Sequence, residues 1–326
     1  MTTNQKMEKR RLGGTELTVS RACLGTMTFG AQTDIKAAAR MVRTCLDRGV
    51  NFFDTANVYN AGESERLLGQ VLVDCRKDIV LASKVGMKVG EHPAGLTEKL
   101  IVTALEATLR RLNTEYLDLC YFHLPDWQTP VEESLAAMDR LVRDGKVRYV
   151  GSSNYPAWQI CHMLCVAERQ GYQRVGIAQQ MYNLIARRLE DEFLPFASEF
   201  GISTVAYNPL AGGLLTGKHK GGAPEPGTRF DANKAYLDRY WNQVNLEAVT
   251  RLETIAAEAK RSLVSLALNW LLHHTPIDCV VLGASRLEQL EENLRALDDG
   301  ALDRTSVSAC DDLWRGLYGP SPKYSR

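Results

Sequence analysis

The chain has 326 residues, a length that suits either two domains or one large architecture such as an α/β barrel. Its 39 basic and 39 acidic residues give a formal net charge of zero, so no overall field favours nucleic acid or an anionic membrane surface. No run of residues approaches the roughly 18 apolar positions that a membrane span needs. We therefore expect a soluble cytoplasmic protein that acts on a small molecule, with no nucleic-acid and no membrane partner. The sequence leaves its oligomeric state open.

The eight cysteines are spread along the chain and lie mostly in apolar stretches, which indicates reduced, packed thiols rather than a disulfide framework. Cys161, His162 and Cys165 have the spacing of one helical turn. A zinc site there would need further ligands nearby, and the sequence offers none. We therefore expect no metal.

Short apolar runs alternate with amphipathic helical stretches from end to end. The eight expected strands are Arg21–Leu24, Asn51–Asp54, Ile79–Ser83, Leu117–Phe122, Tyr149–Gly151, Ile177–Gln179, Ser203–Ala206 and Cys279–Leu282. The helical stretches between them include Ile35–Asp47, Thr97–Arg111, Val131–Arg143 and Glu190–Glu199. Strands that alternate with helices predict parallel βαβ units, and eight such units close into a (β/α)8 TIM barrel. No glycine- or proline-rich linker divides the chain, so residues 1–326 are predicted to form a single barrel domain.

Two further segments lie outside this alternation. A short hairpin is predicted over Arg11–Ser20, where Gly13 and Gly14 form a turn, and it would cap one end of the barrel. The one long irregular segment is His219–Tyr236, which contains Gly221, Gly222, Pro224, Pro226 and Gly227. It follows the seventh strand, so we expect a lid over the catalytic mouth; a tolerated surface insertion is the alternative.

Active sites of such barrels lie at the C-terminal ends of the strands. Asp54 ends the second strand and Tyr59 follows in the next loop, while the third strand runs into Lys84 and the fourth into His123. Each residue alone has an ordinary explanation as a turn former, a solvated charge or a packing residue. On three consecutive strand ends they face one small volume, which favours a shared catalytic site.

These residue types fit proton transfer. A phenol with a pKa of about 10 is a poor acid at neutral pH unless a nearby ammonium stabilises its anion. Lys84 is the candidate ammonium for Tyr59, and Asp54 would hold that ammonium charged and oriented. A neutral His123 can hydrogen-bond a carbonyl oxygen and fix its geometry. Because the chain has no nucleophile elbow, HExxH helix or Walker loop, hydride transfer with protonation of the resulting alkoxide is the reaction that fits.

At these residues the chain resembles the aldo-keto reductase superfamily, and the likeness covers nearly its whole length. The matching motifs are Leu24-Gly25-Thr26-Met27, Phe53-Asp54-Thr55-Ala56, Gly151-Ser152-Ser153-Asn154 and Gly283-Ala284-Ser285. The segments 207–213 and 288–293 resemble the branch that holds potassium-channel β subunits and aflatoxin aldehyde reductases. The resemblance implies a TIM barrel, NADPH/NADP+ as cofactor, and a catalytic tetrad of Asp54, Tyr59, Lys84 and His123.

The cofactor-binding residues follow partly from the residues themselves. The segment 25–30 lacks the GxGxxG spacing of a Rossmann turn, and barrels bind phosphate with the loops after strands seven and eight. Lys218 and Arg229 suit a pyrophosphate, and Ser285 and Arg286 stand where a helix N-terminus favours the extra phosphate of NADPH.

The resemblance adds further contacts. It implies that Ser153, Asn154 and Gln179 hold the nicotinamide carboxamide and that Tyr207 stacks on the ring. The remaining implied positions are Gly25, Thr26, Met27, Gln32, Asp54, Asn208, Pro209, Leu210, Gly212, Gly283, Gln289, Glu292 and Asn293. Most relatives carry serine where this chain has Asn208, which changes the side chain beside the first phosphate but keeps a backbone donor there.

The substrate is expected to be a small carbonyl compound or alcohol that contacts Tyr59, His123 and Trp127. Met27, Phe29, Met87 and Tyr155 also lie just past strand ends, and Trp314 and Tyr318 would close the cleft from the C-terminal segment. Two other functions stay open. One is a barrel that binds NADPH and signals redox state to a partner, although His123 replaces the asparagine of the channel-subunit pattern. The other is a phosphate-handling isomerase on the same fold.

Overall fold

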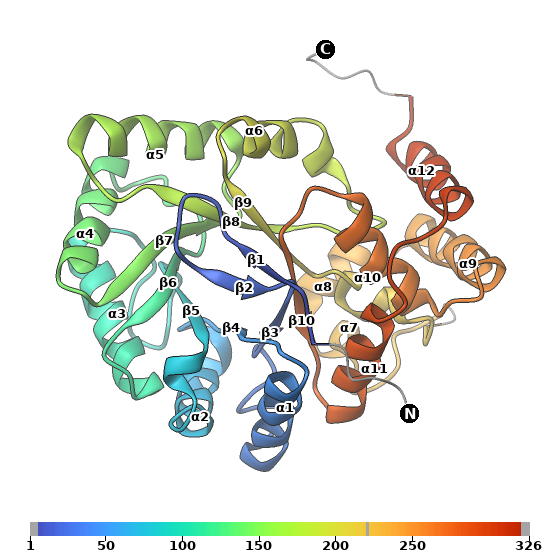
Figure 1. Cartoon of the computed structure of the whole chain (residues 1–326), viewed down its shortest axis with the longest axis horizontal. Coiled ribbons are helices and arrows are strands. Elements are labelled where there is room, and N and C mark those ends of the chain that lie inside the picture. Colours follow the sequence, from blue (N-terminus) through green and yellow to red (C-terminus); the bar gives the residue numbers. More distant parts are fainter. Residues whose placement is uncertain (1–5, 220–221, 321–326) are drawn as a thin grey trace.

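The computed structural model describes residues 6–219 and 222–320, so Gly221 and the start of the polar amino-terminal segment lie outside the described residues. At its centre a closed barrel of parallel strands confirms the predicted fold class (Figure 1). Its strands are β3 (Ala22–Gly25), β4 (Phe52–Asp54), β5 (Val80–Val85), β6 (Leu117–Phe122), β7 (Val147–Ser153), β8 (Val175–Met181), β9 (Ser203–Tyr207) and β10 (Cys279–Gly283). Every position of β5 and β6 is buried, as expected for strands covered by helices outside and by core side chains inside.

Helices surround the barrel. They are α1 (Ile35–Asp47), α2 (Glu63–Val71), α3 (Glu98–Leu112), α4 (Val131–Arg143), α5 (Ala157–Gln170), α6 (Phe193–Glu199), α9 (Gln243–Glu258), α10 (Leu263–His274), α11 (Leu287–Leu297) and α12 (Arg304–Tyr318). Short 3-10 turns are η1 (Tyr59–Gly62), η2 (Arg76–Asp78), η3 (Arg188–Glu190) and η4 (Ala211–Thr216). The four helical stretches predicted from the sequence correspond to α1, α3, α4 and the segment of η3 and α6. In α1 the carboxylate of Asp34 accepts from the Ala37 amide, which starts the helix at the position that the sequence predicts.

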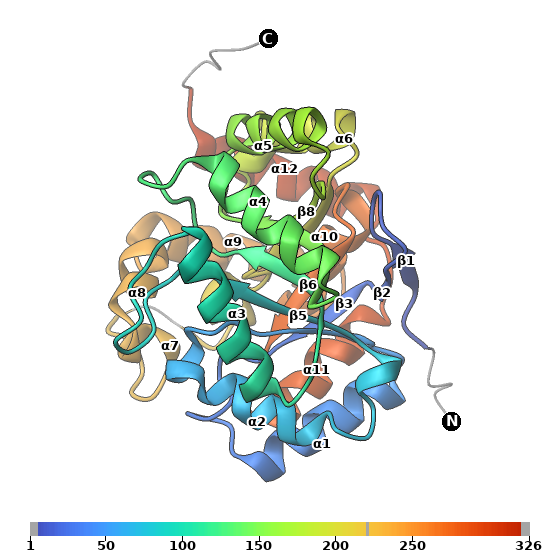
Figure 2. The ribbon, with the colours of Figure 1, turned by 90° about the vertical axis from the view of Figure 1, so that its left-hand side faces the viewer.

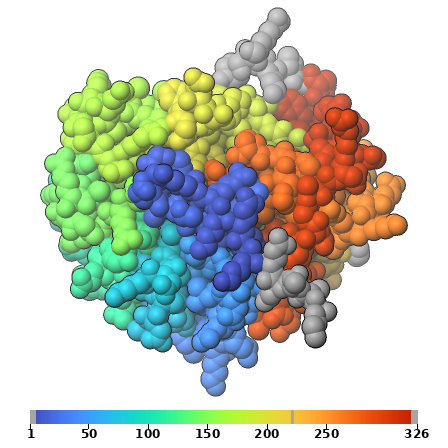
Figure 3. All heavy atoms as spheres, in the orientation of Figure 1, coloured from blue at the N-terminus to red at the C-terminus, as the bar shows by residue number. Residues whose placement is uncertain are grey.

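The predicted hairpin closes the N-terminal end of the barrel. Strands β1 (Lys9–Arg11) and β2 (Thr18–Ser20) pair antiparallel and lie across the face seen in Figures 1 and 3. Leu12 and Leu17 pack into the same buried cluster as Phe52 inside the barrel, and the Gly13 amide donates to Ser203 Oγ at 2.6 Å. With this end closed, the opposite end is the one open to a ligand. No helix in the described ranges is long and apolar enough to span a membrane.

The expectation of an irregular segment over 219–236 is wrong for its second half. Residues there form α7 (Arg229–Ala232) and α8 (Lys234–Tyr240), which Figure 2 shows on the side away from β1 and β2. Asn233 Oδ1 accepts from the amides of Ala235 and Tyr236 and so caps α8. Phe230 is buried against the rings of His219 and Trp241, at centroid distances of 5.2 and 5.0 Å. These ring contacts join residues too far apart for local periodicity to reveal.

Helix packing around the barrel yields a stability prediction at Gly69 in α2. A Cβ there would lie 2.6 Å from the Leu112 carbonyl carbon and 2.7 Å from the Arg111 oxygen, both backbone atoms of the neighbouring segment. Gly69→Ala is therefore expected to lower the free energy of unfolding by about 1–3 kcal/mol, measured by urea denaturation. Gly316→Ala in α12 is the control, because nothing lies within 4 Å of a Cβ there. It should be neutral or stabilising, and equal effects of the two substitutions would contradict the packing argument.

Candidate active site

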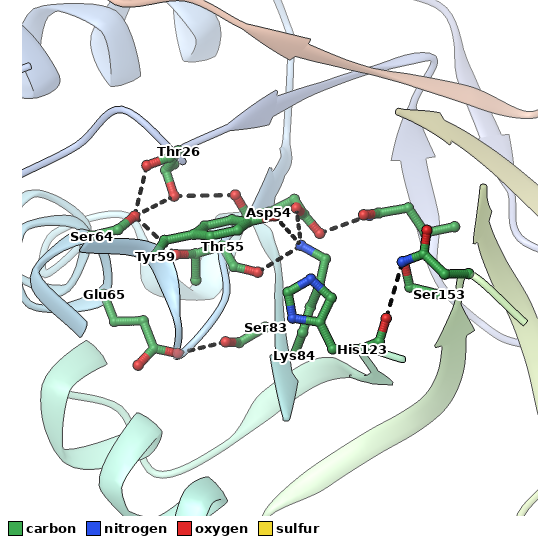
Figure 4. A network of polar contacts seen from close by, with 12 residues as sticks. Thr26, Asp54, Thr55, Tyr59, Ser64, Glu65, Ser83, Lys84, His123 and Ser153 are labelled. Carbon is green, nitrogen blue, oxygen red and sulfur yellow. Dashed lines mark hydrogen bonds and ion pairs between the residues drawn. The ribbon is translucent and has the colours of Figure 1, made fainter. Parts of the chain in front are cut away.

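The four residues expected to be catalytic meet at the C-terminal ends of adjacent strands (Figure 4). Asp54 ends β4, Lys84 lies near the end of β5, and His123 directly follows β6. Tyr59 begins η1, the turn that joins β4 to α2. Asp54 is 2% exposed and Lys84 is 1% exposed, so the two charges sit beneath the open end of the barrel rather than on its rim.

Lys84 donates three hydrogen bonds, one for each proton of its ammonium. Its Nζ lies 2.5 Å from Asp54 Oδ1, 2.8 Å from the Thr55 carbonyl oxygen and 3.2 Å from the Tyr59 hydroxyl. Burial opposes the charge on Lys84, but Asp54 and Tyr59 outweigh it and raise the pKa of the ammonium above its usual value. Lys84 therefore stays charged and holds a positive charge against the phenol oxygen.

Tyr59 remains protonated near neutral pH. Burial raises the pKa of its phenol, while the Lys84 ammonium acts in the opposite direction. The effect of Lys84 was expected from the sequence, but the effect of burial was not. Because burial is the larger of the two, the pKa of Tyr59 rises. A phenol with a raised pKa keeps its proton until a stronger base forms beside it.

His123 is a neutral imidazole in this setting. Burial, and then the nearby Lys84 charge, lower its pKa to about 3. Its ring stands edge-on to the Tyr59 ring at a centroid distance of 6.1 Å, and its Nδ1 has no hydrogen-bond partner among the described residues. A neutral histidine next to the phenol can exchange a hydrogen bond with a ligand oxygen without adding charge.

Two side chains assigned to the cofactor by resemblance also brace the site itself. Gln179 Nε2 donates to Asp54 Oδ2 at 2.9 Å, so both carboxylate oxygens of Asp54 are hydrogen-bonded. Asn154 Nδ2 donates to the His123 carbonyl oxygen at 3.0 Å, and its Oδ1 accepts from the Tyr207 hydroxyl at 2.6 Å. The amide groups of Gln179 and Asn154 thus fix the orientation of the catalytic strand ends.

A cleft of about 1260 Å³ opens above these residues. Tyr59, His123 and most residues assigned to the cofactor line it: Gly25, Met27, Gln32, Asp54, Ser153, Asn154, Gln179, Tyr207, Asn208, Pro209, Leu210, Gly212, Lys218, Arg229, Gly283, Ser285, Arg286, Gln289, Glu292 and Asn293. Thr26 and Trp127 are not among the lining residues. Thr26 is fully buried, and its hydroxyl contacts the Asp54 carbonyl and Ser64. Trp127 is 74% exposed and packs against Trp158.

Several cations line the cleft, and three of them, Lys218, Arg229 and Arg286, lie close enough together to repel one another, with Glu225 as a carboxylate nearby. Burial, together with repulsion from the two arginines, lowers the pKa of Lys218. The adjacent backbone of Asn208, Ala211, Gly212 and Gly213 has positive φ at each of these residues, a conformation that turns amides toward one side. This part of the cleft is therefore suited to a polyanion.

Two lining residues, Tyr236 and Arg239, were missed in the sequence because α8 was not anticipated. The Tyr236 hydroxyl donates to Asn208 Oδ1 at 3.3 Å, and the Arg229 guanidinium lies 4.9 Å from its ring centroid. The capping residue Asn233, followed by the largely helix-favouring run 234–240, was the available signal.

The aromatic and apolar residues expected to form the substrate pocket separate into two groups. Met27 and Met87 line the cleft, whereas Phe29 and Tyr155 are buried outside it. Trp314 and Tyr318 lie on α12, where Trp314 faces Arg187 and Tyr318 faces Arg188. Neither of them lines the cleft, so the expectation that Trp314 and Tyr318 close it is wrong.

The sequence model of the Aldo/keto reductase family matches residues 21–315, which span every strand of the barrel. The chain belongs to the aldo/keto reductase family. This match and the oxidoreductases among its relatives show that it is an oxidoreductase of that family. It is 38% identical over 324 residues to aflatoxin B1 aldehyde reductase member 2 of Mus musculus, covering 93% of this chain and 87% of the relative.

Two further relatives show the range of proteins that this aldo/keto reductase resembles. A probable voltage-gated potassium channel subunit beta of Oryza sativa is 37% identical over 305 residues, covering 90% of this chain and 92% of the relative. An uncharacterised oxidoreductase of Bacillus subtilis is 35% identical over 330 residues, covering 97% and 99%. The family resemblance and the branch inferred from the sequence are thereby confirmed.

The pKa of His123 predicts how the stability of this aldo/keto reductase depends on pH. Its folded-state pKa of about 3 is below the ordinary value of 6.5. As pH falls below 6.5, His123 takes up a proton in the unfolded chain before it does so in the folded protein, and the folded state therefore loses stability. At pH 5 this costs about 2 kcal/mol, and His123→Asn should abolish that part of the loss. Urea denaturation of both proteins at pH 8 and pH 5 measures it. The same acid-induced loss of stability in both proteins would show that the pKa of His123 is not lowered in the folded protein.

Proposed function

We propose that this aldo/keto reductase uses NADPH to reduce an aldehyde or ketone reversibly to an alcohol, with Tyr59 as the general acid. The observation that supports this most strongly is the third hydrogen bond of Lys84, which sets an ammonium 3.2 Å from the Tyr59 hydroxyl at the floor of the cleft. A protonated phenol beside a fixed positive charge is suited to giving up its proton only when a strongly basic oxygen forms.

The roles of the residues follow from their contacts. Tyr59 donates its proton to the substrate oxygen as that oxygen gains negative charge, and Lys84 stabilises the phenolate that remains. Asp54 keeps Lys84 charged through the 2.5 Å contact, and the neutral His123 hydrogen-bonds the substrate oxygen and orients it. In the direction of alcohol oxidation the same phenolate takes the proton back.

The cleft fits a dinucleotide with an extra phosphate. NADPH, when bound, supplies the hydride. Lys218 and Arg229 would hold the pyrophosphate, and Arg286, the N-cap residue of α11, would hold the additional phosphate. Repulsion from Arg286 and Arg229 lowers the pKa of Lys218 even though Glu225 lies nearby, which favours a ligand that carries several negative charges.

The substrate we propose is a small carbonyl compound bound between Tyr59, His123 and the methionines Met27 and Met87, which line the same cleft. Several of the relatives are named as aflatoxin aldehyde reductases, which supports an aldehyde among the substrates. The exposed Trp127 is kept as a substrate contact only for compounds that extend beyond the cleft.

Tyr59→Phe tests the acid directly. The variant keeps the ring and loses the hydroxyl, so kcat for a carbonyl substrate should fall by about 10²–10⁴-fold while NADPH affinity stays within a few-fold. Lys84→Met should give a similar loss, and the double variant should be no worse than either single one because both disable one relay. Tyr155→Phe is the matched control, since it removes a buried hydroxyl that lies outside the cleft and donates to the Leu124 carbonyl. Retention of more than about a tenth of parental kcat by Tyr59→Phe would rule out the assignment of Tyr59 as the acid.

A parent protein that binds NADPH tightly but turns over no carbonyl compound would favour a redox-sensing role.

Arg286→Ala tests the choice of cofactor. The variant should weaken NADPH binding by about 1–3 kcal/mol, the range of a charge-assisted contact, and leave NADH binding nearly unchanged. Fluorescence titration gives both dissociation constants. Arg295→Ala removes an exposed arginine from the same helix, away from the cleft, and should change neither. A parent protein with equal affinity for the two cofactors would contradict the role of Arg286.

A further inference from the structure

The backbone that follows Tyr59 adopts an unusual conformation. Asn60 has φ 49° and ψ 44°, Ala61 has φ 54° and ψ 33°, and Gly62 has φ 92°, so three successive residues are left-handed. Such conformations are unfavourable for L-residues other than asparagine, and an alanine gains no side-chain hydrogen bond in return. A turn of this kind persists only where surrounding contacts hold it.

The carboxamide of Asn60 provides such contacts. Its Nδ2 donates to the Met27 carbonyl oxygen at 3.0 Å and to the Phe29 carbonyl oxygen at 2.7 Å. Both carbonyls belong to the loop between β3 and α1, which contributes Met27 and Thr28 to the cleft. Both amide protons of Asn60 are thus used to clamp the turn to that loop.

Beyond the turn, α2 is anchored by other side chains, one of which also contacts the loop after β3. Ser64 Oγ donates to the Thr26 carbonyl at 2.7 Å, and Glu65 accepts from Ser83 Oγ at 2.5 Å (Figure 4). Glu65 also accepts from Arg111 at 2.7 Å. Ser83 directly precedes Lys84 on β5, so α2 is tied to the strand that carries the ammonium. On the other side of Tyr59, the Asn57 amide donates to the Lys84 carbonyl oxygen at 3.3 Å. The left-handed turn is therefore the link between Tyr59 and the anchored helix α2.

We propose that Asn60 is a positioning residue that holds the Tyr59 hydroxyl against Lys84 by clamping this turn to the loop after β3. The inference rests on the proposed role of Tyr59 as the acid. The contact from Lys84 to Tyr59 is the longest of the three that the ammonium makes, at 3.2 Å against 2.5 and 2.8 Å. It is therefore the contact most easily lost when the turn relaxes.

Asparagine meets both requirements of this position. Its side chain donates to two carbonyls, and its backbone tolerates the left-handed region better than most residues. Glycine would satisfy the backbone but remove the clamp. Aspartate would keep the shape but offer only acceptors to two carbonyl oxygens.

The experiment measures kcat against pH for Asn60→Gly in the full-length protein. We expect kcat to fall about tenfold or more, since displacement of a catalytic group by about 1 Å costs up to about 10²-fold. In alcohol oxidation the pKa of the kcat profile should shift to higher pH, because Lys84 lowers the pKa of Tyr59 and a displaced phenol loses that effect. In a Tyr59→Phe background the same substitution should have no further effect on residual kcat.

Ala61→Gly is the matched control, because it relieves a left-handed alanine in the same turn without removing a side-chain hydrogen bond. It should keep the parental kcat and pH profile and raise Tm. If Asn60→Gly fails to fold, as judged by circular dichroism, Asn60→Asp replaces it and should show the same kinetic defect.

Three outcomes would overturn the proposal: a parental kcat and pH profile in Asn60→Gly, an equal loss in Ala61→Gly, or a loss that persists in the Tyr59→Phe background. Collapse of kcat in Tyr59→Phe with a parental Asn60→Gly would refute this inference alone. Full activity of Tyr59→Phe would instead refute the proposed function.

Discussion

The buried ion pair between Lys84 and Asp54 is the constraint on which the site depends. Two charges beneath a barrel mouth are costly unless every proton and lone pair finds a partner. Here all three protons of the ammonium are hydrogen-bonded, and Gln179 donates a hydrogen bond to the second carboxylate oxygen of Asp54. Satisfying the third proton of Lys84 places it against Tyr59, and the same charge helps to keep His123 neutral. The contacts that stabilise the buried charges are therefore the same contacts that position the proposed catalytic groups.

The two ends of the barrel differ in structure and in function. The hairpin of β1 and β2 closes the N-terminal end with an apolar plug, so the interior is a packed core. The C-terminal end carries loops whose backbones enter left-handed conformations at Asn60, Asn154, Asn208 and Ala211. Rigid strands thus hold functional groups on turns that bend sharply, and side-chain amides such as those of Asn60 and Asn154 keep these turns in place.

Relatives of this chain include proteins named as aldehyde reductases and proteins named as channel subunits, at similar identity. Overall similarity therefore does not separate an enzyme with turnover from a regulatory protein, whereas the residues of the site bear on that difference. The neutral His123 and the protonated Tyr59, held beside Lys84, are suited to protonating an alkoxide. The proposed reductase activity rests on this group of side chains.

The strand pattern and the residue types at the strand ends were legible in the sequence, because periodicity and strand-end position are local properties. That is why the barrel and the meeting of Asp54, Tyr59, Lys84 and His123 could be anticipated. Only the tertiary structure decided which groups pair. Gln179 and Asp54 are 125 residues apart, and the contact between them depends on the closure of the whole barrel. The burial of Thr26 and the exposure of Trp127 have the same origin, since each depends on neighbours distant in the chain.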